Sequence, residues 1–121
     1  MREKKPNLIV DKSYEFAIKI VDLYKYLVYE KKEFVLSKQI LRSGTSIGAN
    51  TREAVVSQSR KEFISKLNIA LKEAHESEYW LDLLKHGSFI DDETPLFKDI
   101  DCIIRILTSI IKSTNENNSK S

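Results

Sequence analysis

The chain is poor in the residues that interrupt helices, because its 121 positions include only three glycines and two prolines. Folds built from many short strands need frequent turns and draw on both residue types to make them. Their scarcity therefore argues against an all-β fold. Hydrophobic residues form 41% of the chain, enough to bury a core. Length and composition predict one domain over residues 1–121.

Cysteine and long apolar runs are also scarce. Cys102 is the single cysteine, so no disulfide can form within the chain, and a reducing compartment is the simpler assumption. It lies in the apolar run 100–111, where a cysteine is typical of a small buried hydrophobe. No apolar run approaches the roughly 18 residues of a membrane span, and the segment MREKKPNLIVDKS lacks the apolar centre of a signal peptide. We therefore expect a cytoplasmic protein with no membrane partner.

What the sequence does contain is helical periodicity, with apolar residues recurring at alternating intervals of four and three. The pattern predicts four helices, at about 11–30, 34–57, 60–86 and 95–113, and a flexible polar tail at 114–121. Asp11 or Ser13 is the expected cap of the first helix, and Thr94 followed by Pro95 is expected to begin the fourth. Because the connections are short, neighbouring helices are predicted to be antiparallel. The fold class is therefore all-α, an antiparallel up-down-up-down four-helix bundle.

The second helix has an unusual centre, in which Gly44 and Gly48 stand one turn apart among small and polar residues. Each glycine costs a helix about 1 kcal/mol relative to alanine. Close packing against another helix is the preferred reason, and a bend or loop and a ligand site are the alternatives. The motif lacks the lysine and the spacing of a phosphate-binding loop. Ser43 and Asn50, on the predicted inward row, are expected to bond to neighbouring helices or water and to set the register.

Two features predict self-association. The fourth helix carries apolar rows on both its Ile103 and Ile104 sides, which exceeds what one bundle core needs and favours a buried position or a subunit interface. Several tyrosines and Trp80 also lie off the apolar rows. Of these aromatic residues, Tyr79 and Trp80 are the candidate interface anchors.

Charge is balanced overall, at a formal +2, but it is unevenly distributed. Residues 31–62 contain seven bases and three acids, whereas residues 87–121 contain four bases and six acids. A surface with one positive side is compatible with a polyanionic partner. The candidate phosphate-binding residues are Lys38, Arg42, Arg52, Arg60 and Lys61.

Catalytic and metal-binding readings find little support. His75 and His86 are the only histidines, and neither follows a glutamate at the spacing of a di-iron bundle. Glu73 and Glu76 could hold a cation or perform acid–base chemistry, but such a pair more often faces solvent or binds bases on the second helix. We predict no catalytic residue, no metal and no cofactor.

The runs LRSGTSIGANTREA and SRKEFISKLNIALKEAHESEYWLDLL closely resemble the 23S ribosomal RNA intervening-sequence proteins, sometimes labelled S23 ribosomal proteins. SYEFAIKIVDLYKYLV and KKEFVLSKQ extend the resemblance to about residues 13–85. It implies a four-helix bundle that forms a homopentameric ring. A related branch is the accessory protein of diversity-generating retroelements, which binds a reverse transcriptase and nucleic acid. No biochemical activity is implied for the main branch.

Two hypotheses follow. In the first, the chain is an oligomeric, non-enzymatic accessory protein that binds RNA or DNA through backbone phosphates, with little base specificity. In the second, it is a protein–protein assembly module without meaningful affinity for nucleic acid.

Overall fold

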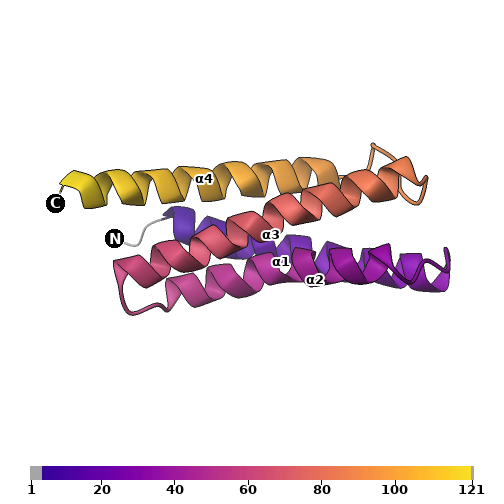
Figure 1. Ribbon diagram of the computed structural model, residues 1–121, viewed down its shortest axis with the longest axis horizontal. Coiled ribbons are helices and arrows are strands. Elements are labelled where there is room, and N and C mark those ends of the chain that lie inside the picture. The colour runs from indigo at the N-terminus through magenta and orange to yellow at the C-terminus, as the bar shows by residue number, and fades with distance from the viewer. Residues whose placement is uncertain (1–3, 121) are drawn as a thin grey trace.

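The computed structural model describes the backbone of residues 4–120 and the side chains of residues 8–116. It contains four helices, α1 (Lys4–Tyr29), α2 (Leu36–Val55), α3 (Arg60–His86) and α4 (Leu96–Lys120). Each helix contacts two neighbours, in the pairs α1–α2, α2–α3, α3–α4 and α4–α1. The helices run alternately up and down, and the start of α1 and the end of α4 lie at the same end of the bundle as the α2–α3 turn (Figure 1). The predicted all-α antiparallel bundle is confirmed.

The core is built from the rows that the periodicity identified. The fully buried seam of α1 includes Phe16, Ile20 and Leu27, and α3 and α4 bury equivalent rows. Each large side chain removed from water contributes about 1.5–3 kcal/mol, so this core is the main source of stability. The seam of α2 is smaller and more polar, with Ser43, Gly44, Gly48 and Thr51 buried in its centre.

Two helices are longer than predicted. α1 begins at Lys4, and Ile9, one heptad before Phe16, is buried as part of the same seam. Pro6 falls in the first turn, where its missing N–H interrupts no helical bond. The prediction of Asp11 or Ser13 as the cap is therefore wrong, because both residues lie in the helix interior, where Ser13 is fully buried.

At the other end of the chain, α4 continues past residue 113 to Lys120. Thr114 supports the continuation, since its Oγ1 donates to the carbonyl of Ile110 at 2.8 Å. The segment predicted as a flexible tail is thus helical as far as the structure describes it, and Ser121 lies outside the described residues.

Helix ends are fixed by local hydrogen bonds. Lys32 takes a left-handed backbone conformation, with φ of 56°, and the carboxylate of Glu33 then accepts N–H groups from the first turn of α2. At α3, Ser59 Oγ accepts from the N–H of Glu62 at 3.0 Å. α4 begins after Pro95, whose carbonyl accepts from the N–H of Asp99 at 2.9 Å. The cap that Thr94 supplies to Leu96 is long, at 3.5 Å.

Candidate nucleic-acid and protein interfaces

The glycine pair lies in the interior of α2 and faces α1. A Cβ added at Gly44 would come within 2.9 Å of Ile20 Cγ1, closer than real Cβ atoms approach, whereas one at Gly48 would meet Ser13 O at an ordinary 3.4 Å. Gly44 is therefore the position at which α1 and α2 need the missing side chain. α2 is continuous through both glycines, so the alternative of a loop does not hold.

Buried hydroxyl groups link α2 to both of its neighbours. Ser13 Oγ on α1 and Thr51 Oγ1 on α2 are 3.0 Å apart, and Ser77 Oγ on α3 donates to Ser43 Oγ at 2.9 Å. Because each hydroxyl pair is fully buried and needs a particular alignment of its two helices, the pairs favour one register.

Asn50 differs from its predicted role. It is half-buried, and its Nδ2 donates to the carbonyl of Ser46 within α2 at 2.9 Å; among the described residues this amide has no partner on a neighbouring helix. Thr51, the next residue, occupies the inward position instead. An asparagine can donate to a carbonyl of its own preceding turn, so its place in the sequence does not show whether it faces the core.

Arg42 is bound by two carboxylates of α3. Its Nη1 lies 3.2 Å from Glu73 Oε1, and its Nη2 donates to Glu76 Oε2. The hydrogen bond that Arg42 donates to Glu76, reinforced by the charges of both glutamates, raises the pKa of Arg42 above its already high ordinary value. The pairing of Glu73 and Glu76 with a base on α2 agrees with the interpretation from the sequence. It also means that the Arg42 guanidinium already has carboxylate partners within the bundle.

Glu76 also binds Trp80, one member of a neighbouring aromatic pair. The indole Nε1 of Trp80 donates to Glu76 Oε2 at 2.9 Å, and this bond, followed by that of Arg42, lowers the pKa of Glu76. Trp80 is half-buried against the core. Tyr79 meets it edge-on, with ring centroids 5.0 Å apart, and remains 56% exposed. Of the two predicted interface residues, Tyr79 is the one open to a partner.

The other predicted bases are exposed. Lys38 lies in the first turns of α2, and Arg52 stands near its end with its guanidinium 5.0 Å from the centre of the Tyr14 ring. Arg60 and Lys61 open α3, across the short turn from Arg52. The structure therefore brings three of the five bases to the α2–α3 turn and leaves Lys38 and Arg42 nearer the opposite end of α2.

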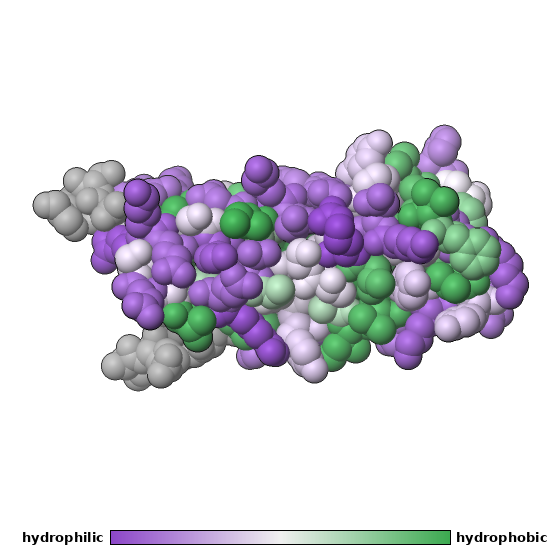
Figure 2. Space-filling view, turned by 60° about the horizontal axis from the view of Figure 1, so that its bottom comes forward, coloured by the Kyte–Doolittle hydropathy of each residue, from purple (hydrophilic) through white to green (hydrophobic). Residues whose placement is uncertain are grey.

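Exposed apolar side chains are concentrated on α1, whereas the apolar rows of α4 take the buried position that was one of the two alternatives predicted for them. α4 contributes none of the strongly exposed large hydrophobic residues in the described part of the chain, because Phe97, Ile104 and Ile111 pack against the core. On α1, by contrast, Tyr14, Ile18 and Val21 are exposed. Figure 2 looks onto α2 and the adjoining side of α1, where hydrophobic side chains lie among polar ones and gather toward the end that carries the α1–α2 loop.

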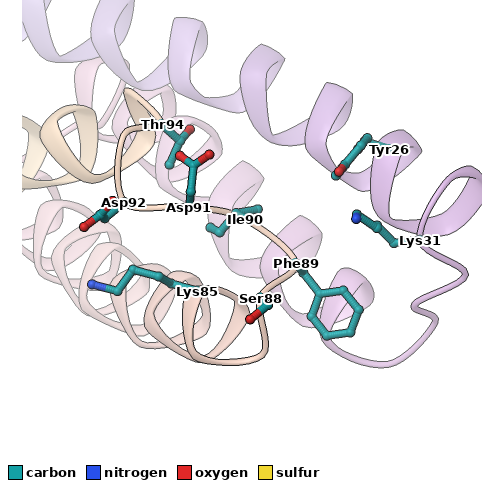
Figure 3. Close-up of a pocket in the computed structure, with 9 residues that line it drawn as sticks. All are labelled: Tyr26, Lys31, Lys85, Ser88, Phe89, Ile90, Asp91, Asp92 and Thr94. Carbon is teal, nitrogen blue, oxygen red and sulfur yellow. The ribbon is translucent and has the colours of Figure 1, made fainter.

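Two hollows lie away from these residues. An open cleft of about 660 Å³ separates the end of α1 from the α3–α4 loop, and its walls include Tyr26, Lys31 and Asp91 (Figure 3). A smaller cavity of about 110 Å³ between α1 and α4 adjoins the half-buried Cys102. In the described part of the chain, no three His, Cys, Asp or Glu side chains are grouped so that they could hold a metal ion. Over the same residues, none of the helices has the length and apolar character needed to cross a bilayer.

Comparison with known proteins places this architecture in a family. No curated protein matches the chain. A crystal structure of a protein of unknown function from the S23 ribosomal protein family of Bacteroides thetaiotaomicron VPI-5482 is 61% identical, with a TM-score of 0.88 over 89% of this chain and 98% of that one. The family model for the 23S rRNA-intervening sequence protein matches residues 5–109. The chain therefore belongs to the 23S rRNA-intervening sequence protein family.

Proposed function

We propose that the chain is a non-enzymatic, cytoplasmic accessory protein that assembles into a ring, with five copies expected, and binds nucleic acid through backbone phosphates. The binding surface is the basic end, defined as Arg52, Arg60 and Lys61 around the α2–α3 turn. All three side chains are exposed. Copies arranged in a ring would present several basic ends together, which raises avidity without new contacts.

The observation that carries this proposal is that Glu53 and Glu62, the two acids closest to the basic end in sequence, are engaged within the bundle. Glu53 Oε1 lies 2.7 Å from Lys66 Nζ, and Glu62 Oε1 accepts the backbone N–H of Gln58 at 3.2 Å. None of the three bases has a carboxylate within ion-pair distance among the described residues. Their charges are consequently available to phosphates.

The test compares two variants in electrophoretic mobility shift and fluorescence anisotropy with single-stranded RNA. Arg52→Gln/Arg60→Gln/Lys61→Gln is expected to weaken binding and to reduce the slope of log affinity against log salt by about 2, since each lost phosphate contact removes roughly 0.7 from it. Arg42→Gln is the matched control, because that guanidinium already binds Glu73 and Glu76. No shift of RNA or DNA at about 50 mM salt, or equal binding by the triple variant, would refute the proposal.

A second candidate, a protein–protein assembly module, is favoured by the geometry at Tyr79. Trp80 is fixed from one side by Glu76 and by the core, so the exposed Tyr79 ring rests on a rigid support. Pre-ordered aromatic side chains lose little freedom on binding and commonly anchor interfaces. Light scattering of the wild-type protein without nucleic acid tests whether the copies associate on their own.

A further inference from the structure

A third hollow lies at the basic end, between the α2–α3 turn and the end of α4, which occupy the same end of the bundle (Figure 1). Its volume is about 410 Å³, within the range of about 300–1,000 Å³ that is typical of ligand pockets. We call it the turn pocket. The residues that line it include Ala54, Val55, Gln58, Arg60, Phe63 and Thr114.

One part of the turn pocket is apolar. Ala54 is fully buried, Val55 is 43% exposed, and Phe63 is half-buried against the core while it also lines the pocket. An aromatic ring in the wall of a binding site gives a nucleic-acid base a surface on which to stack, and it accepts any base because every base has a π face. The pocket therefore offers apolar cover to a planar ring without selecting its sequence.

Two polar side chains of the turn pocket remain available to a ligand. Ser57 Oγ donates to a carbonyl of α2 at 2.7 Å, and Ser59 Oγ accepts the N–H of Glu62 at 3.0 Å, so both hydroxyls are already engaged. Among the described residues, the side-chain amide of Gln58 has no hydrogen-bond partner and Arg60 has no carboxylate within ion-pair distance. An amide can donate to and accept from the edge of a base, and a guanidinium binds phosphate.

The charge that faces the turn pocket is positive. No acid is among the described residues that line it. Of the acids nearest in sequence, Glu53 pairs with Lys66, and Glu62 accepts a backbone N–H of the turn. Glu116 is two residues beyond Thr114 on α4, which places it roughly 200° around the helix and on another side. The pocket thus suits a ligand that carries negative charge.

The other two hollows lack this combination, because acids line both of them. Asp91 and Asp92 belong to the walls of the 660 Å³ cleft, and Glu15 and Asp99 to those of the 110 Å³ cavity. Of the three hollows, only the turn pocket joins an aromatic ring, a free amide and an unpaired cation without a carboxylate. These are the groups that a base and its phosphate require.

We propose that the turn pocket takes an unpaired base of a single-stranded nucleic acid, with the base against Phe63, its edge at Gln58 and the adjoining phosphate at Arg60. The inference rests on the proposed function and deepens it by naming a single strand as the ligand. In a duplex the bases are paired and stacked, and one enters a pocket only if it is first flipped out. A surface that binds phosphates alone favours the duplex instead, because the duplex has the denser charge.

The test measures fluorescence anisotropy of three labelled probes with the full chain: oligo(dT), an abasic strand of the same length, and the duplex of oligo(dT) with oligo(dA). Oligo(dT) is expected to bind at least about fivefold more tightly than either of the others, as loss of one stacked base predicts. Equal binding of the abasic strand, or tighter binding of the duplex, would overturn this inference and leave phosphate binding standing. Binding of no probe at about 50 mM salt would overturn both.

Phe63→Leu removes the ring but keeps an apolar side chain in the pocket. It is expected to weaken oligo(dT) binding by about fivefold or more, and to leave both the abasic strand and the salt dependence unchanged because no phosphate contact is lost. Phe97→Leu is the matched control, since Phe97 is also half-buried against the core but stands at the start of α4, away from the basic end. Equal loss in both variants, or no loss in Phe63→Leu, would overturn the assignment. Circular dichroism confirms that both variants are folded.

Two further variants change exposed residues and leave the core intact. Gln58→Ala is expected to weaken oligo(dT) binding by about twofold or more without affecting the abasic strand, because the amide meets the base. Arg60→Gln is expected to weaken binding of both strands and to reduce the slope of log affinity against log salt by about 0.7. An equal effect of Gln58→Ala on both strands would overturn its assignment to the base.

A free nucleotide offers the same base and phosphate as one unit of the strand. Thymidine monophosphate, added as a competitor, is expected to displace oligo(dT) only at a concentration at least about a hundredfold above that of the unlabelled strand, because the strand also reaches Arg52 and Lys61. Displacement at an equal concentration would show that the pocket serves a small nucleotide, and would overturn the proposal.

Discussion

At the residue scale, the two glycines of α2 are equivalent in sequence but not in the structure. Gly44→Ala is expected to lower the free energy of unfolding, because the new methyl would meet the stiff, branched side chain of Ile20 at 2.9 Å. Gly48→Ala meets only ordinary contacts and is expected to gain up to about 1 kcal/mol from helix propensity. Urea unfolding of both variants checks this, and stabilisation by Gly44→Ala would show that α1 and α2 do not need the close approach.

The hydroxyl pair Ser13–Thr51 provides a second test at this scale. Ser13→Ala and Thr51→Val are each expected to cost about 1 kcal/mol or more, because each leaves a buried hydroxyl without one of its partners. The double variant is expected to cost less than the sum, by about 0.5 kcal/mol or more. Ser13→Ala combined with Ser77→Ala is the control, because these two hydroxyls share no hydrogen-bond partner and their effects are expected to add.

These residues show which features of the helices could be predicted from the sequence and which could not. Spacing identified the large buried side chains correctly, since a leucine or isoleucine at an inward position has little alternative. It misassigned Ser13 and Asn50, because a small polar side chain can cap a helix, bond its own preceding turn or cross to a neighbour. Only the position of the facing helix decides among these, and that position is a product of the whole fold.

At the element scale, α2 is held at its start by Glu33. Burial raises the pKa of Glu33, but the backbone N–H groups of Leu36, Ser37 and Val35 outweigh it and lower the pKa below its ordinary value. A lowered folded-state pKa contributes stability above the unfolded-state pKa, near 4.3, and this contribution is lost as pH falls through the folded-state pKa.

Glu33→Gln is therefore expected to cost about 0.5–1 kcal/mol at neutral pH, as weakening of a helix cap does. The difference from wild type is expected to shrink as pH falls below about 4.3, where the wild-type carboxylate also becomes neutral. Chemical unfolding across this range measures it. Glu30→Gln is the control, since that carboxylate lies outside the cap, and a pH-independent difference for Glu33→Gln would mean that charge has no part in capping α2.

The ends of the elements were harder to predict than their number. The sequence predicts a flexible polar tail after residue 113 and a first helix that begins only near residue 11, beyond Pro6. Yet a proline in the first turn breaks no bond, and a polar segment can continue a helix by its own backbone hydrogen bonds. The Glu33 cap has no signature in the usual set of Ser, Thr, Asp and Asn, so it could be recognised only once the loop conformation was known.

At the scale of the whole molecule, the exposed apolar side chains lie mainly on α1, and none of those in the described part of the chain is on α4. α4 reads as too apolar for one partner, but its second row lies over the core between its two neighbours, where Lys85 also covers the ring of Phe97 at 5.3 Å. α1 reads as an ordinary amphipathic helix, and its outward apolar side chains become apparent only when no other element covers them. Periodicity describes each helix alone, whereas coverage depends on all four.

Self-association is the prediction that belongs to this scale. Light scattering at micromolar concentration is expected to give a mass several times that of one chain, and Tyr79→Lys is expected to lower it. The new lysine would place a charge on the rigid aromatic support that Trp80 and Glu76 provide, and interfaces exclude such charges from their centres. Tyr29→Lys is the matched control, because Tyr29 is also exposed but lies at the end of α1. A wild-type protein that scatters as a single chain would contradict the ring, and an assembly insensitive to Tyr79→Lys would place the interface elsewhere on the bundle.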